Sequence, residues 1–132
     1  MYYSTHIIAG AAVGYLTGDV VSGFGAGVVS HALLDMIPHH DVQRIRYCLG
    51  DIASGSLFFL LFLIYGKHGA PLIAGAIGGT LPDLEIPLFY FNIVKRRYFP
   101  SHSGVVAHRQ ASFLPGLMTQ VVIAVIGLWI IN

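Results

Sequence analysis

The feature that most constrains this chain is a series of apolar segments rich in glycine and alanine. They cover about residues 7–17, 20–37, 52–66, 70–82 and 113–131. Only the last approaches the roughly 20 residues that a simple membrane-spanning helix needs. Glycine and alanine let helix backbones approach closely in lipid. The pattern therefore predicts an all-α fold, a small integral membrane helical bundle of about five short Gly/Ala-rich helices.

The composition favours lipid over water as the surrounding medium. Of the 132 residues, 55% are hydrophobic and 10% are charged, whereas an ordinary soluble domain has roughly 25% charged residues. This length suits one domain, so we expect residues 1–132 to form a single membrane-embedded helical domain. The net charge of +1 argues against nucleic acid as a partner. The single Cys48 excludes an intramolecular disulfide framework and a thiolate metal cluster.

Alternating helix directions would divide the loops between two sides of the membrane. The amino terminus, the loop at 38–51 and the segment 83–112 then share one side, opposite the turns at 18–19 and 66–70. Most basic residues fall on the first side, namely Arg44, Arg46, Lys95, Arg96, Arg97 and Arg109. Only Lys67 falls on the second side. By the positive-inside rule, the first side is cytoplasmic.

The same topology gathers most histidines and carboxylates on the cytoplasmic side. They lie at the ends of the predicted helices or in the adjoining loops: His6, His31, Asp35, His39, His40, Asp41, Asp51, Asp83, Glu85, His102 and His108. Only Asp19 and His68 lie on the opposite side. An ionisable group near hydrocarbon is costly unless it is paired, ligated or hydrated. This convergence therefore predicts a single site.

Two short motifs suggest that the site binds metal. His31 and Asp35 are four residues apart, so they share one helix face and can reach one divalent ion or two neighbouring ions. The alternative is a histidine paired with a carboxylate of its own helix. In "LPDLE", Pro82 favours an irregular backbone on which Asp83 and Glu85 turn inward. Solvation at the end of a helix is the alternative for both carboxylates.

The remaining histidines and one arginine leave more than one role open. His102 and His108 are six residues apart, so a break in the helix at Gly104 would be needed to aim both at one centre. Arg109 is either an anion clamp for phosphate or an interfacial arginine that reaches toward water. His6 is either a metal ligand or an ordinary interfacial histidine.

Four further polar residues have open roles. His39, His40, Asp41 and Asp51 can complete the ligand set, act as a general base or orient ligands, and Asp51 can instead cap the helix that it precedes. Histidine and aspartate without cysteine favour zinc, with manganese and iron as alternatives. Such an ion activates water and stabilises the cleavage of an ester. Hydrolysis of a phosphoester is therefore the reaction that we expect.

The motifs "THIIAG", "SHALLDMIPHHD", "GGTLPDLEIP" and "HSGVVAHR" together resemble the membrane-bound metal-dependent hydrolases of the YdjM-like group of bacteria and archaea. That group is distantly similar to zinc-dependent phospholipase C and the P1-type nucleases. The resemblance covers most of the chain and implies an all-α protein of a prokaryotic-type cytoplasmic membrane. It also implies metal ligands at His6, His31, Asp35, Asp83, His102 and His108.

The leading hypothesis is a membrane-bound metal-dependent hydrolase, a phosphoesterase that acts on a lipid or lipid-linked phosphate at the cytoplasmic interface. The aromatic and basic stretch at 88–99 would hold the anionic head group. We add His40 to the metal ligands and assign catalytic roles to Asp41, Asp51, Glu85 and Arg109. The alternatives are a non-enzymatic protein that senses, stores or transports metal, and a structural bundle with a vestigial site. The few polar residues on the opposite side argue against transport.

Overall fold

The computed structural model describes residues 1–42, 44–65 and 69–132, and within these ranges it is helical, with no strand. The helices in chain order are α1 (Tyr3–Thr17), α2 (Val20–Asp35), α3 (Ile45–Tyr65), α4 (Ala70–Thr80), η1 (Leu81–Leu84), α5 (Glu85–Tyr90), α6 (Pro100–Ser103) and α7 (Phe113–Ile131). The predicted all-α bundle is confirmed. Lys67 and His68, which the sequence places on the side opposite the site, lie outside the described residues.

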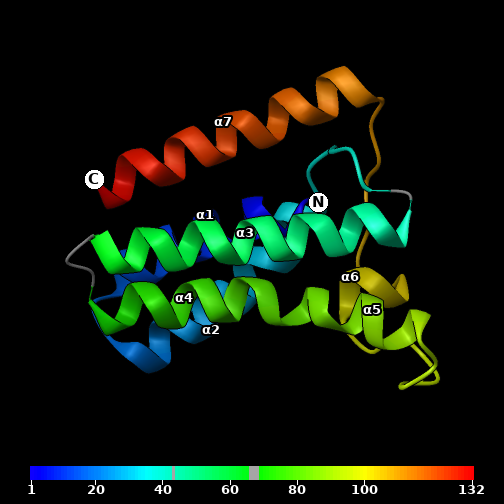
Figure 1. Ribbon diagram of the computed structural model, residues 1–132, viewed down its shortest axis with the longest axis horizontal. Coiled ribbons are helices and arrows are strands. Elements are labelled where there is room, and N and C mark those ends of the chain that lie inside the picture. The colour runs from blue at the N-terminus through cyan, green and yellow to red at the C-terminus, as the bar shows by residue number, and fades with distance from the viewer. Residues whose placement is uncertain (43, 66–68) are drawn as a thin grey trace.

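Helices that can cross a membrane are present in the described part of the chain. Three stretches are long and apolar enough, namely Ile45–Ile64, Ala70–Tyr90 and Phe113–Ile131. The second combines α4, η1 and α5, which follow one another along the same edge of the bundle (Figure 1). α2 is a shorter apolar helix. These helices associate the protein with a membrane.

The predicted helix boundaries agree with the structure for α2, α4 and α7 to within a few residues. α1 begins at Tyr3 and not near residue 7, and α3 begins at Ile45 and not near residue 52. The first turns of α3 contain Arg46 and Asp51, and these charged residues interrupt the apolar pattern without ending the helix. Asp51 therefore lies inside α3, and the prediction that it could cap this helix is wrong.

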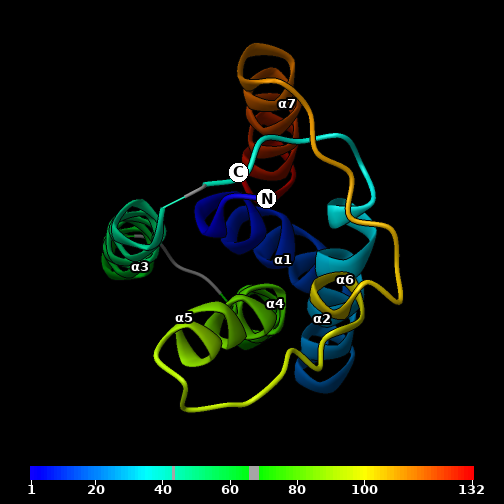
Figure 2. The ribbon, with the colours of Figure 1, turned by 90° about the vertical axis from the view of Figure 1, so that its right-hand side faces the viewer.

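The centre of the bundle consists of α1, α2 and α4, and α3 and α7 pack against α1 from outside (Figure 2). Glycines allow this close approach, as the composition predicts. A Cβ atom at Gly27 of α2 would overlap the carbonyl oxygen of Gly75 and would lie 2.8 Å from the nitrogen of Gly79, both in α4. A Cβ atom at Gly10 of α1 would also overlap the Gly75 carbonyl oxygen. Backbone-to-backbone packing thus fixes the three central helices relative to one another.

The first turn of α1 is held by α3. The Asp51 carboxylate accepts a hydrogen bond from the Tyr3 N–H at 2.6 Å and one from the Ser4 N–H at 3.4 Å. The first N–H groups of a helix lack partners within it, and Tyr2, at the N-cap position, offers no side-chain cap. Asp51 therefore caps a neighbouring helix and sets the position of His6, which follows in α1.

The chain between α5 and α7 returns across one end of the bundle (Figures 1 and 2). It contains α6, which ends at Gly104 in the left-handed conformation, with φ of 83°. The predicted helix break at this glycine is confirmed. Further on, the Arg109 N–H donates to the carbonyl oxygen of Asp35 at 3.1 Å, and the Arg109 carbonyl oxygen accepts from the His39 N–H at 3.1 Å. These bonds attach the returning segment to the end of α2.

Candidate metal centre

A cluster of histidines and aspartates lies at the end of the bundle where α1 begins and α2 ends. Its members come from α1, α2, η1, α6 and two loops: His6, His31, Asp35, His39, Asp41, Asp83, His102 and His108. The most enclosed are His31, Asp35 and His39, each 0% exposed. Burial of so many ionisable groups is unfavourable unless they are paired or ligated.

Asp35 is the centre of this cluster. Imidazole nitrogens lie within 3.9 Å of its two carboxylate oxygens, and they belong to His6, His31, His39, His102 and His108. Oδ1 lies 3.4 Å from His6 Nε2, and Oδ2 lies 3.4 Å from His31 Nε2. Ser101 donates a hydrogen bond to Oδ2 at 2.7 Å. One carboxylate therefore faces imidazole nitrogens from residues as far apart in the sequence as His6 and His108.

Backbone carbonyl groups orient two of the histidines. His31 Nδ1 lies 2.7 Å from the carbonyl oxygen of Gly79, and His39 Nδ1 lies 2.7 Å from the carbonyl oxygen of Ile37. A carbonyl oxygen only accepts, so in each ring Nδ1 carries the proton and donates. Nε2 of each ring then faces the cluster, in His31 toward Asp35 and in His39 toward Asp41. Metal-binding histidines are held in this way in proteins.

Glu85 orients a third histidine. Its carboxylate accepts hydrogen bonds from the backbone N–H groups of Tyr98 and Phe99 and lies 3.2 Å from His102 Nδ1. A carboxylate accepts this proton, so the Nε2 lone pair of His102 also points into the cluster. Glu85 was predicted as a catalytic residue, and the structure places it behind His102, where it joins the start of α5 to the start of α6.

These orientations bring two Nε2 atoms close together. His31 Nε2 and His102 Nε2 lie 3.4 Å apart, and they lie 3.4 Å and 3.7 Å from Asp35 Oδ2. Ligand atoms bound at 2.0–2.1 Å around a tetrahedral ion are separated by roughly 3.4 Å. The three atoms therefore have the spacing of one face of a tetrahedral metal site.

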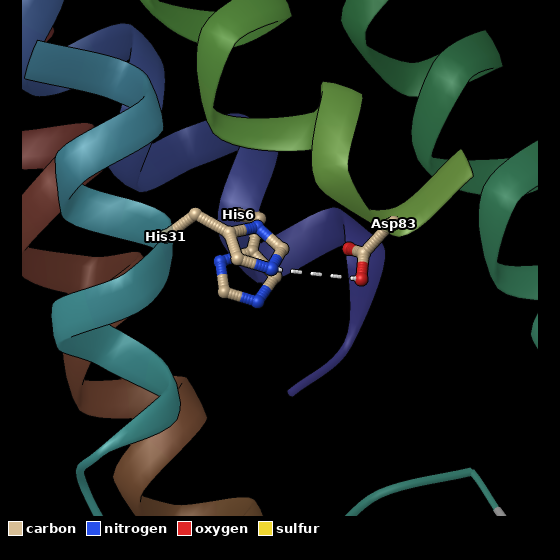
Figure 3. Close-up of side chains that lie close together, drawn as sticks. All are labelled: His6, His31 and Asp83. Carbon is tan, nitrogen blue, oxygen red and sulfur yellow. Dashed lines mark ion pairs between the residues drawn. The ribbon is translucent and has the colours of Figure 1, made fainter. Parts of the chain in front are cut away.

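Unpartnered polar atoms lie beside this triangle. The rings of His6 and His31 stack with centroids 3.8 Å apart, and His31 Nε2 lies 3.9 Å from Asp83 Oδ1 (Figure 3). Both ring nitrogens of His6 and Oδ2 of Asp83 are buried without a hydrogen-bond partner. Leaving such groups unsatisfied is costly, and a cation held between the imidazoles and the carboxylate would satisfy one His6 nitrogen and the Asp83 oxygen.

The donors form three overlapping groups that can hold a metal ion. Within each group the ligand atoms lie within 4.8 Å of one another: His6, His31 and Asp83; His31, Asp35 and His102; Asp35, His39 and His108. Imidazole nitrogen and carboxylate oxygen suit zinc, manganese and iron. A divalent metal ion therefore fits the residues of this cluster.

The cluster residues outside the membrane-spanning helices differ in proton affinity. Burial and the neighbouring His31 lower the pKa of His102, which favours the neutral imidazole that binds metal. Asp35 and Asp41 raise the pKa of His108 to about 9, because both carboxylates stabilise its protonated form. Burial alone would raise the pKa of Asp41, but hydrogen bonds from His108 and His39 hold it below the usual range. Without metal, the carboxylates thus hold a proton on His108.

His40, which we predicted as a ligand, points away from the cluster. Its ring packs edge-on against Phe113 with centroids 5.3 Å apart, and its carbonyl oxygen accepts a hydrogen bond from Gln120 at 3.0 Å. His39 lies in the cluster instead, with Nε2 2.9 Å from Asp41 Oδ1. Pro38 ends the helix, and side chains alternate in direction in an extended chain. Because of this alternation, His39 and Asp41 lie on the same side of the chain and His40 lies on the other. The alternation could have identified His39, and not His40, as the member of the cluster.

The residues predicted as catalytic occupy different positions. Asp41 is half-buried and contacts His39 and His108. Asp51 caps α1. The side chain of Arg109 is exposed, and its backbone joins the returning segment to α2. Asp41 is therefore the predicted catalytic carboxylate in closest contact with the histidines of the cluster.

Replacement of His39 is expected to weaken metal binding about 100-fold, and replacement of His40 to leave it within about threefold. Structural zinc contributes roughly 10–16 kcal/mol through four ligands, or about 3 kcal/mol for each. Competition with a fluorescent chelator would measure both affinities in the purified His39→Ala and His40→Ala variants. Equal losses in the two variants would contradict the ligand set derived from the structure.

A cavity of about 710 Å³ lies beside the cluster. Asp41, Asp83, His102 and His108 contribute to its wall, and the rest comes from the amino-terminal segment, the loop after α2, α3, α5 and the segment that follows α5. The cluster is therefore accessible to a molecule larger than water.

Comparison with protein-family models, with curated proteins and with solved structures found no match to this chain. The function is therefore argued from the geometry and chemistry of the site.

Proposed function

We propose that this protein is a membrane-bound metal-dependent hydrolase, a phosphoesterase that acts at the cytoplasmic face of the membrane. The observation that carries the proposal is the pair of Nε2 atoms of His31 and His102, 3.4 Å apart beside Asp35. Their Nδ1 atoms face acceptors, so both Nε2 atoms point at the Asp35 carboxylate in a buried space. A metal ion between them would be bound by all three groups.

Zinc suits these donors best, with manganese and iron as alternatives. The ligands would be those of the three overlapping donor groups, and Asp35 belongs to two of these groups. The set is large enough for one ion or for two ions that share Asp35. A divalent ion supplies Lewis acidity toward a phosphoryl oxygen and lowers the pKa of water at the site. The motif resemblance to the YdjM-like hydrolases supports the same reaction class.

The chain's own residues have separate roles in this proposal. Asp41 lines the cavity and contacts His39 and His108, so it would orient these two ligands toward the metal. Glu85 and Asp51 are positioning residues, because they hold His102 and the first turn of α1. Arg109 is exposed at the same end of the bundle and would face anionic lipid.

The test measures metal content and hydrolysis on the same preparation. Protein purified in mild detergent would be analysed by elemental mass spectrometry, then supplied with zinc, manganese or iron and assayed on chromogenic phosphomonoesters and phosphodiesters. We expect bound metal and metal-dependent turnover, both lost in His31→Ala and both retained in His40→Ala. Bound metal without turnover of any ester would favour a non-enzymatic metal-binding protein. A protein that binds no metal would indicate a structural bundle.

A further inference from the structure

The cavity beside the cluster has one polar wall and one apolar wall. The polar wall includes Asp83, His102 and His108. What we call the apolar wall is formed mainly by residues of two helices, Ile45, Cys48 and Ile52 on α3 and Ile86, Phe89 and Tyr90 on α5. Asp51 of α3 also lines the cavity, with its carboxylate bonded to the first turn of α1. Residues three, four or seven apart lie on one helix face, so each helix turns a continuous side toward the cavity.

The apolar wall adjoins the lipid-facing surface of the protein. α3 is long and apolar enough to cross a membrane, and only 6% of its apolar stretch is buried inside the protein. Leu57 and Leu60, further along α3, are 57% and 53% exposed. A hydrocarbon chain that lies between α3 and α5 would therefore extend from the cavity into the bilayer.

One arginine supplies a positive charge to this cavity. Arg97 lines it, and its guanidinium lies 5.0 Å from the centre of the Phe89 ring, in the apolar wall. Its neighbour Arg96 stacks on Tyr98 instead, at 4.9 Å. A guanidinium binds phosphate through paired hydrogen bonds. Arg97, and not Arg109, therefore has the position of a phosphate-binding residue.

We propose that the cavity binds a phosphate-headed lipid. Its phosphate would lie between the metal-binding cluster and Arg97, and its hydrocarbon chain would pass between α3 and α5. The inference rests on the proposed function, because the metal centre is the second binding partner of the phosphate. It goes further by assigning a path to the hydrocarbon chain of the lipid and by naming Arg97 as the residue that determines specificity for the phosphate.

Binding of a ligand that cannot be hydrolysed tests the head-group assignment. Zinc-loaded protein would be titrated calorimetrically with octylphosphonate. Loss of a charge-assisted hydrogen bond is expected to weaken binding about tenfold or more in Arg97→Gln. Arg96→Gln removes the same charge one residue away and should bind like the wild type. Equal affinities in the two variants would overturn the role of Arg97.

Labelling of Cys48 tests where the hydrocarbon chain of the ligand lies. It is the single cysteine and lines the apolar wall, so maleimide labelling followed by mass spectrometry reads out this position alone. Octylphosphonate should slow the labelling several-fold, whereas methylphosphonate at saturation should leave the rate unchanged. Bound octylphosphonate that leaves the rate unchanged would overturn the path between α3 and α5.

The two proposals fail in different ways. Phosphonate binding that depends on Arg97, with protection of Cys48, would support the inference even if no ester were hydrolysed, and the proposed hydrolase function alone would then be wrong. Turnover of soluble phosphoesters without octylphosphonate binding would support the hydrolase and overturn the lipid site. Equal affinity for methylphosphonate and octylphosphonate would indicate a site for free phosphate groups.

Discussion

Replacement of Asp35 by alanine is expected to remove metal from the protein. Asp35 belongs to two of the three donor groups, and its carboxylate faces all of the histidines that line the cluster. At about 3 kcal/mol for each lost ligand, affinity should fall about 100-fold for one ion and further if two ions share the residue. Elemental mass spectrometry of the purified Asp35→Ala and Asp35→Asn variants would measure the loss.

Asp19 provides a matched control in the same helix. It lies at the opposite end of α2, where its carboxylate accepts hydrogen bonds from the N–H groups of Val21 and Ser22. Asp19→Ala removes the same charge and is expected to keep the wild-type metal content. Metal retained by Asp35→Ala, or lost equally from both variants, would contradict the assignment of Asp35 as a ligand.

Replacement of Gly27 by alanine is expected to destabilise the bundle by about 1–3 kcal/mol. The new Cβ atom would overlap the Gly75 carbonyl oxygen, and backbone can move away only if α2 and α4 separate. His31 lies one turn further along α2 and binds the Gly79 carbonyl oxygen of α4, so the same separation should weaken metal binding. Denaturant unfolding in detergent micelles, followed by circular dichroism, would measure the change in stability.

Gly25 gives the contrasting substitution. It lies in the same helix, and a Cβ atom added there would have open space around it. Gly25→Ala should be neutral or should stabilise the helix by up to about 1 kcal/mol, because alanine favours the helical conformation. Similar losses from Gly25→Ala and Gly27→Ala would show that close packing of α2 on α4 is not what the glycine provides.

The sequence allowed the helical architecture and the gathering of polar residues at one end to be predicted. Apolar segments separated by turns specify helices in lipid, and alternating directions bring particular helix ends together. That reasoning placed His6, His31 and Asp83 at the same end, and the structure stacks the first two rings and sets the carboxylate beside them. It needed no knowledge of contacts between helices.

Predictions that depended on contacts between helices were less accurate. The hydrogen bonds of Asp51 to Tyr3 and of Glu85 to the backbone before α6 join segments that are distant in sequence, and no local pattern indicates them. The start of α3 was misplaced because hydropathy measures the apolar part of a helix, which is shorter than the helix. The choice of His40 over His39 overlooked a local rule, the alternation of side chains in an extended segment.

The order in which the chain is made determines when the cluster can be completed. His6 emerges early in synthesis and His108 late, with α3 and α4 between them. The glycine contacts among α1, α2 and α4 involve none of the residues that follow α4, so these helices can associate before the returning segment is synthesised. On this order, His102 and His108 would complete the cluster after α1, α2 and α4 have packed together. Complete coordination would therefore be a late event in biogenesis, after insertion into the bilayer.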